Sequence, residues 1–203
     1  SSAKRRPFTM DELRQVLIVA PSEWRSMIMF GLYTGQRLAD IARLSWANID
    51  PQANEVFLRT RKTGRVVRVP ICDPLSSHIA TLPCSDDPSA PLHPEAYLIA
   101  QKNSSALSRK FGQILATAGL APKERLSHQR KGAGRSSKRT QSGWSFHSLR
   151  HTATSLMKNA GISPAVVQDI IGHDSAEISA HYTVIESDAK RQALSTLPDV
   201  NNS

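Results

Sequence analysis

Five short segments of the chain carry side chains suited to chemistry on a phosphate. The segments are Thr34-Gly35-Gln36-Arg37-Leu38-Ala39-Asp40, Lys62-Thr63-Gly64, His147-Ser148-Leu149-Arg150-His151, Gly172-His173 and the single residue Tyr182. Guanidinium groups are planar donors that hold phosphate oxygens through paired hydrogen bonds. A phenol has a pKa near ~10, so it attacks poorly at neutral pH unless its proton is removed or cations stabilise the oxyanion. Side chains of these types could hold a phosphate and present a tyrosine hydroxyl to it.

The order and spacing of the segments carry more information than any segment alone. Three positions separate His147 from Arg150, and nine separate His173 from Tyr182. A short Thr-Gly-x-Arg or Gly-His string often arises by chance. In this order, however, the five segments resemble the tyrosine recombinases, the phage integrase family. The resemblance runs from about Phe8 to Pro198 and implies that family's C-terminal catalytic domain, a mainly α fold with a small antiparallel β-hairpin or sheet.

The resemblance assigns a role to each residue. Arg37 and Arg150 would clamp the attacked phosphate, and Tyr182 would attack its phosphorus to leave a 3′-phosphotyrosine bond. His147 would hydrogen-bond the phosphate or accept the tyrosine proton, and His173 would donate to a non-bridging oxygen. Lys62 would protonate the departing 5′ oxygen. Asp40, one turn after Arg37, could accept a hydrogen bond from a guanidinium. The resemblance implies neither a metal nor ATP.

Each assignment has a plainer alternative. Arg37 could be a surface or helix-capping arginine, and His173 could be a packed histidine at a helix end. Lys62 could contact the DNA backbone without transferring a proton, as could the neighbouring Arg61 and Arg65. The order of the segments favours the functional interpretation in each case, and His151 and His181 are interpreted as structural neighbours.

Positive charge is concentrated in two places. Residues 123–140 contain seven basic residues and one acidic residue, Glu124, a net +6 of the chain's formal +9. Their glycines and serines and their lack of apolar periodicity predict a mobile loop, 121–143. Its charge pattern fits contacts with phosphates, and a solvated loop without such contacts is the alternative. The second cluster lies on a predicted hairpin. The residues predicted to bind DNA are Arg59, Arg61, Arg65, Arg130, Lys131, Arg135, Lys138 and Arg139.

Two arrangements of histidine and cysteine are discounted as metal sites. His147 and His151 have a spacing that can bind zinc, but no third ligand is near in sequence. Cys72, His78, Cys84 and His93 match no common zinc-finger spacing. We therefore expect no metal and no cofactor.

The elements that would position these residues begin with helical patterns. Thr9-Met10-Asp11-Glu12 is a capping box that predicts a helix from Met10. An apolar helix of about Glu23 to Tyr33 follows, with Gly35 suited to a left-handed C-terminal position. A short third helix is predicted from Leu38, with Arg37 in its first turn.

The rest of the chain alternates between strand and helix signals. Residues 55–60 and 66–71 flank Thr63-Gly64 and predict a β-hairpin. Apolar spacing or capping signals then predict helices, and prolines predict a loop at Pro83–Pro94. The predicted helices are Pro74–Leu82, Ser105–Ala118, His147–Ala160, one after the N-cap Ser163, one near Ser175 and Glu186–Leu197.

Composition excludes several classes of protein. Hydrophobic residues form 39% of the 203 residues, enough for a core. No apolar run is long enough to span a membrane, and two cysteines are too few for a disulfide scaffold. The few cysteines indicate a reducing, cytosol-like compartment, and the basic balance favours a nucleic acid partner over a membrane surface. We therefore expect a cytoplasmic, nucleoid-associated protein.

Domain limits and assembly follow as expectations. Residues 1–7 would be a tail or linker, 8–198 the catalytic domain and 199–203 a C-terminal tail. The resemblance implies a further N-terminal domain of about 100 residues that embraces the other side of the DNA. Without that domain we expect this chain to be mostly monomeric. We expect the full-length protein to be a tetramer on double-stranded DNA. The helix Glu186–Leu197 could dock on a neighbouring subunit or on its own core. Alternatives to a recombinase are a type IB topoisomerase, a telomere-resolving enzyme or a catalytically silent DNA-binding module.

Overall fold

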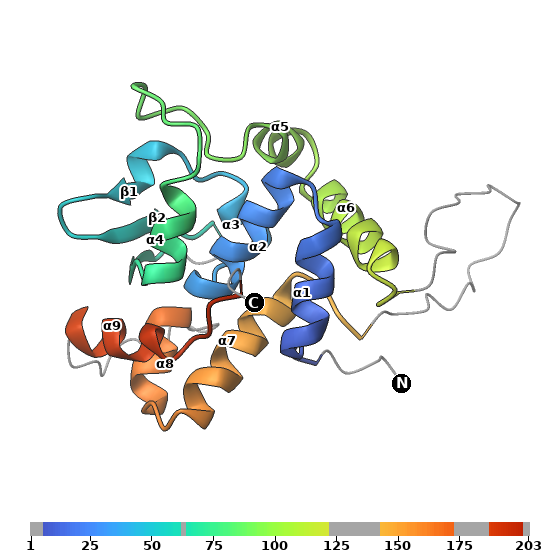
Figure 1. Ribbon diagram of the computed structural model, residues 1–203. Helices are drawn as coiled ribbons and strands as arrows, with labels where there is room; N and C mark the ends of the chain where they lie inside the picture. The colour runs from blue at the N-terminus through green and yellow to red at the C-terminus, as the bar shows by residue number, and fades with distance from the viewer. Residues whose placement is uncertain (1–5, 62–63, 122–142, 173–186, 201–203) are drawn as a thin grey trace, which may run out of the picture.

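The apolar helix α2 (Ser22–Thr34) lies at the centre of the fold and is buried along most of its length (Figure 1). The computed structural model describes residues 6–61, 64–121, 143–172 and 187–200. Before α2 comes α1 (Met10–Val19), whose predicted capping box is present: the Thr9 hydroxyl accepts from the Glu12 N–H, and the Glu12 carboxylate accepts from the Thr9 N–H. After it, Gly35 has the predicted left-handed conformation, with φ of 65°.

The predicted hairpin is present and gains a third, short strand. Strands β1 (Ile49–Asp50), β2 (Glu55–Arg59) and β3 (Val66–Pro70) form an antiparallel sheet in the order β1-β2-β3. Val56 pairs with Val69 and Leu58 with Val67, and all four side chains are buried. Alternate residues therefore face the core, as the period of two in the sequence indicates.

The other helices surround α2 and the sheet. They are α3 (Leu38–Ile41), the 3-10 helix η1 (Trp46–Asn48), α4 (Asp73–Ile79), α5 (Pro94–Lys102), α6 (Ser104–Thr117), α7 (His147–Asn159), α8 (Pro164–Ile171) and α9 (Ser187–Ser195). The described chain is thus mainly α with a small antiparallel sheet, which confirms the predicted fold class. None of its helices is long and apolar enough to cross a membrane.

Two details differ from the sequence prediction, and a third prediction is not tested. Arg37 precedes the first turn of α3 as its N-cap residue, in an extended conformation. Helix α5 was not predicted, although Pro94 at its first position is a residue that favours helix starts. The helix predicted near Ser175 lies outside the described residues.

Helix α7 packs closely on α2 because Gly31 has no side chain. A Cβ atom at Gly31 would lie 2.8 Å from the Phe146 ring and 2.9 Å from Leu149. Phe146 also meets Phe111 of α6 edge to face, with centroids 5.2 Å apart. This close packing fixes the start of α7, where His147 and Arg150 lie.

The C-terminal helix packs on its own chain. Ala193 and Leu194 of α9 are buried, and α9 contacts α8 and β3. Beyond it, the Tyr33 hydroxyl donates to the Pro198 carbonyl at 2.7 Å and accepts from the Val200 N–H at 3.2 Å. Of the two docking modes left open by the sequence, the structure has the internal one, and packing continues into the segment assigned to the tail.

Candidate functional site

Arg150 joins two of the segments singled out in the sequence. It lies in α7, and only 7% of the residue is exposed. Its guanidinium donates to the Gly35 carbonyl at 3.0 Å and to the Gly172 carbonyl at 2.6 Å. A buried guanidinium needs such acceptors to offset the loss of water. Arg150 therefore ties the turn that leads to Arg37 to the residue that precedes His173.

The turn before Arg37 is built on the end of α8. A Cβ atom at Gly35 would clash with the Ile171 side chain, and its positive φ also favours glycine. The buried Gln36 amide donates to the Thr34 carbonyl at 2.9 Å and to the Ile170 carbonyl at 3.1 Å. These contacts set the position of the half-buried Arg37. Sequence reasoning assigned no role to Gln36, although it lies between Gly35 and Arg37.

Asp40 fixes the end of the sheet to α3. Its side chain is buried, and its carboxylate accepts from the Arg61 backbone N–H at 3.1 Å. The predicted bond from a guanidinium remains a prediction. The observed contact instead holds Arg61, the residue directly before Lys62. Lys62 lies outside the described residues.

His147 is the first residue of α7, one turn before Arg150, so both lie on the same side of the helix. It is half-buried, and its ring meets the His151 ring edge to face, with centroids 4.8 Å apart. This contact agrees with the interpretation of His151 as a neighbour that packs against His147.

His173 and Tyr182 lie outside the described residues, but the chain on either side of them is described. Gly172 accepts the bond from Arg150, and its φ of 87° is strained for any other residue. The Ser187 hydroxyl donates to the Glu55 carboxylate of β2 at 3.0 Å. The described chain therefore stops at Gly172, beside Arg150, and resumes at Ser187, beside the sheet.

The predicted DNA-binding arginines differ in their surroundings. Arg59 and Arg61 are exposed on β2 and just beyond it. Arg65 pairs with Asp169 of α8 at 2.9 Å, so a bond from Arg65 to DNA would compete with this pair. The loop residues lie outside the described part of the chain; they are Arg130, Lys131, Arg135, Lys138 and Arg139.

The histidines and cysteines discounted as a zinc site differ in their surroundings. His93 is fully buried, with its ring nitrogens 3.0 Å from the Ser26 hydroxyl and 3.2 Å from the Ile41 carbonyl oxygen. Cys84 is exposed, whereas Cys72 is half-buried, and burial raises the pKa of its thiol to about 11. Within residues 6–61, 64–121, 143–172 and 187–200, no three His, Cys, Asp or Glu side chains form a group that could hold a metal.

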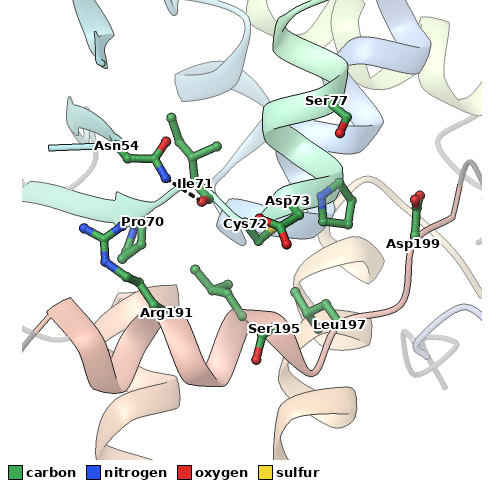
Figure 2. A pocket seen from close by; sticks show the side chains of 12 residues that line it. Asn54, Pro70, Ile71, Cys72, Asp73, Ser77, Arg191, Ser195, Leu197 and Asp199 are labelled. Carbon is green, nitrogen blue, oxygen red and sulfur yellow. Dashed lines mark hydrogen bonds between the residues drawn. The ribbon is translucent and has the colours of Figure 1, made fainter. Parts of the chain in front are cut away.

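A cavity of about 630 Å³ lies between α4 and the C-terminal segment, apart from the described residues that are predicted to act in catalysis (Figure 2). Arg191, Leu194 and Asp199 line it from one side, and Cys72 and Asp73 line it from the other. It contains none of the residues predicted to act in catalysis. The candidate site is therefore the Arg150 junction, by which we mean Arg150 and the two carbonyls that it binds, those of Gly35 and Gly172.

Several solved structures with a similar fold are integrases. The integrase from mycobacterium phage Brujita matches with a TM-score of 0.65 and 16% identity, over 98% of this chain and 60% of that one. The lambda integrase catalytic core matches with a TM-score of 0.53 and 22% identity, over 85% of this chain and 95% of that one. These similarities define the fold class.

The sequence defines the family. Residues 7–188 match the Phage integrase family, and the chain belongs to it. Tyrosine recombinase XerD from Mycobacterium leprae is 28% identical over 176 residues, which cover 83% of this chain and 50% of that protein. The chain thus spans about half the length of this curated relative.

Proposed function

We propose that the chain is the catalytic part of a site-specific DNA recombinase or integrase. The observation that carries this proposal is the junction at Arg150, which joins the segments leading to Arg37 and His173 in a chain of the phage integrase family. The enzyme would cleave and rejoin DNA strands by transesterification.

The reaction balances with the residues of this chain. The Tyr182 oxygen attacks phosphorus, the bond from phosphorus to the 5′ oxygen breaks, and Lys62 gives that oxygen its proton. His147 accepts the phenol proton or bonds the phosphate, while Arg37, Arg150 and His173 stabilise the charge on the phosphoryl oxygens. The phosphotyrosine bond keeps the energy of the broken phosphodiester. A 5′ hydroxyl can therefore reverse the attack without ATP or a metal.

The proposed partner is double-stranded DNA, and the proposed location is the cytoplasm, on the nucleoid. Lambda integrase, which has a similar fold, has been solved as a dimer bound to a core site and as a tetramer bound to a Holliday junction. By analogy, we infer a tetramer on DNA for the full-length protein and mostly monomers for this chain alone. The basic loop 121–143 would add affinity for the backbone.

Relatives favour recombination over the alternatives. The similar proteins are integrases and a recombinase. Supercoil relaxation of the type IB kind and telomere resolution would use the same chemistry, but no observation on this chain favours them. A silent DNA-binding module would not need the ordered set of reactive side chains.

A covalent adduct tests the proposal. The chain is incubated, at concentrations that saturate DNA binding, with nicked suicide duplexes randomised in sequence around the nick. We expect a protein–DNA adduct that survives SDS, and none from Tyr182→Phe. No adduct from the wild-type chain would contradict the enzymatic function, and an adduct from Tyr182→Phe would contradict the assignment of the nucleophile.

A further inference from the structure

Asp169 in α8 bridges two cations from distant parts of the chain. One carboxylate oxygen accepts from the Arg65 guanidinium at 2.9 Å, and the other lies 2.7 Å from the Lys190 ammonium. Arg65 comes from the end of the hairpin connection and Lys190 from α9. Asp169 is thus the meeting point of three elements: the sheet, α8 and α9.

Asp169 and Lys190 are shielded from water, and Arg65 is partly exposed. The Asp169 side chain is 16% exposed and that of Lys190 is 12% exposed, whereas that of Arg65 is 33% exposed. Ion pairs on open surfaces contribute little because water and salt screen them, but shielded pairs are screened less. Removing the carboxylate would leave the Lys190 charge shielded from water without its main partner.

Helix α9 is also tied to the sheet at other points. Lys190 lies 3.5 Å from the Arg68 carbonyl, and the Arg191 guanidinium donates to the Ala53 carbonyl at 2.9 Å. Helix α8 packs against both α9 and β3, and α8 and α9 lie next to each other in Figure 1. Asp169 adds an ion pair from α8 to each side of this packing, to Arg65 beside β3 and to Lys190 of α9.

The positions of the three residues in the chain relate them to the reaction. Arg65 follows Lys62 by three residues, Asp169 precedes His173 by four, and Lys190 follows Tyr182 by eight. The general acid, the phosphate ligand and the nucleophile must act on one phosphorus. A displacement of about 1 Å can cost up to about 100-fold in rate.

We propose that Asp169 is a positioning residue for strand cleavage. Through its ion pairs with Arg65 and Lys190, it fixes the positions of the hairpin, α8 and α9 relative to one another. This inference rests on the proposed function, in which Lys62, His173 and Tyr182 react with DNA. Arg65 then serves cleavage through Asp169 and not through a bond to DNA.

Kinetics of single-turnover cleavage test the proposal, on a duplex selected from the randomised pool. We expect Arg65→Ala and Asp169→Asn each to lower the rate at saturating protein at least about tenfold. The double variant should be no slower than the slower single variant, because both remove the same connection. Arg65→Lys, which keeps the charge, should recover most of the rate, and DNA affinity should stay within about twofold of wild type.

The matched control is an exposed ion pair in α1. Arg14 and Asp11 lie 3.1 Å apart with side chains 43% and 86% exposed. Arg14→Ala and Asp11→Asn should cleave at the wild-type rate. The variant Asp169→Asn/Lys190→Met removes the shielded ammonium, so it keeps the test informative if Asp169→Asn alone fails to fold.

Amide hydrogen exchange supplies a readout that does not depend on catalysis. We expect Asp169→Asn to speed exchange in both the β2–β3 hairpin and α9, and Arg65→Ala to speed it in the hairpin. If the wild-type chain forms no adduct, the proposed function fails while exchange still decides the bracing role. Cleavage at the wild-type rate by folded Asp169→Asn would overturn the inference, as would additive losses of cleavage rate in the double variant. A loss of DNA affinity with an unchanged cleavage rate, or unchanged amide exchange, would overturn it too.

Discussion

At the scale of single residues, buried polar side chains define the site and its surroundings. Arg150 and Asp40 each bind backbone groups next to other predicted site residues. The capacity of Arg150 to bridge two carbonyls depends on its forked guanidinium, which a lysine lacks. The residue types were evident from the sequence, but their backbone partners were not, because those partners lie 21 to 115 positions away.

A buried histidine should make stability depend on pH. Burial lowers the pKa of His93 to about 4, with His78 nearby adding to the effect. An unfolded histidine titrates near ~6.5, so the unfolded chain binds more protons between these values and the free energy of unfolding falls as pH drops. When complete, the loss from His93 should be about 3 kcal/mol. Urea unfolding at intervals from pH 7 to pH 4 measures it.

His93→Gln is the test variant for this pH dependence, which it should flatten in part. The pKa of His78 is also lowered by burial and by Arg25, so His78→Asn is needed to separate its contribution, which has the same sign. An unchanged pH dependence in His93→Gln would contradict the assignment.

Gly35 should tolerate no side chain. Its φ of 65° and its approach to Ile171 predict that Gly35→Ala lowers the free energy of unfolding by about 2 to 4 kcal/mol. The matched control is Gly161→Ala, at φ 80° with open space around it, where only the backbone cost of about 1 to 2 kcal/mol applies. Chemical denaturation compares the two, and equal losses would show that the contact with Ile171 does not matter.

At the scale of elements, the sequence predicted the helix ends, because these depend on residues close together in the chain. The capping box at Thr9, the left-handed Gly35 and the N-cap at Ser163 lie where the sequence placed them. Helix α5 was not predicted because it directly follows a proline-rich loop. The internal docking of α9 depends on contacts between residues far apart in sequence, so the sequence left its docking partner open.

The docking of the C-terminal segment depends on Tyr33. Burial raises the pKa of its hydroxyl, which makes two hydrogen bonds to residues 198 and 200. Tyr33→Phe should lower the free energy of unfolding by about 1 to 3 kcal/mol, because it leaves a carbonyl and an N–H without this partner. Tyr97→Phe, on the half-buried α5 position, should have little effect. Hydrogen exchange at the Val200 amide should rise in Tyr33→Phe, and its protection at the wild-type level would contradict this account.

At the scale of the whole molecule, the charge of +9 divides into groups with different roles. Arg59 and Arg61 are exposed, whereas Arg65 is paired with Asp169. Net charge and charge clusters were legible in the sequence. The sequence did not show which arginines form internal ion pairs, because Arg65 and Asp169 lie 104 positions apart.

Salt dependence of DNA binding should separate these groups. If Arg59 and Arg61 each neutralise one phosphate, the double variant Arg59→Ala/Arg61→Ala should reduce the slope of log affinity against log salt by about 1.8. Arg65→Ala should leave the slope unchanged. Fluorescence anisotropy across a salt series measures this, and a reduced slope for Arg65→Ala would show that Arg65 binds DNA.

We propose that this chain breaks DNA through a tyrosine. The most direct measurement is to isolate the covalent adduct, digest its protein and DNA, and identify by mass spectrometry the residue that carries the nucleotide. We predict a nucleotide joined to Tyr182 through its 3′ phosphate. A nucleotide on any other residue, or one joined through a 5′ phosphate, would contradict the account.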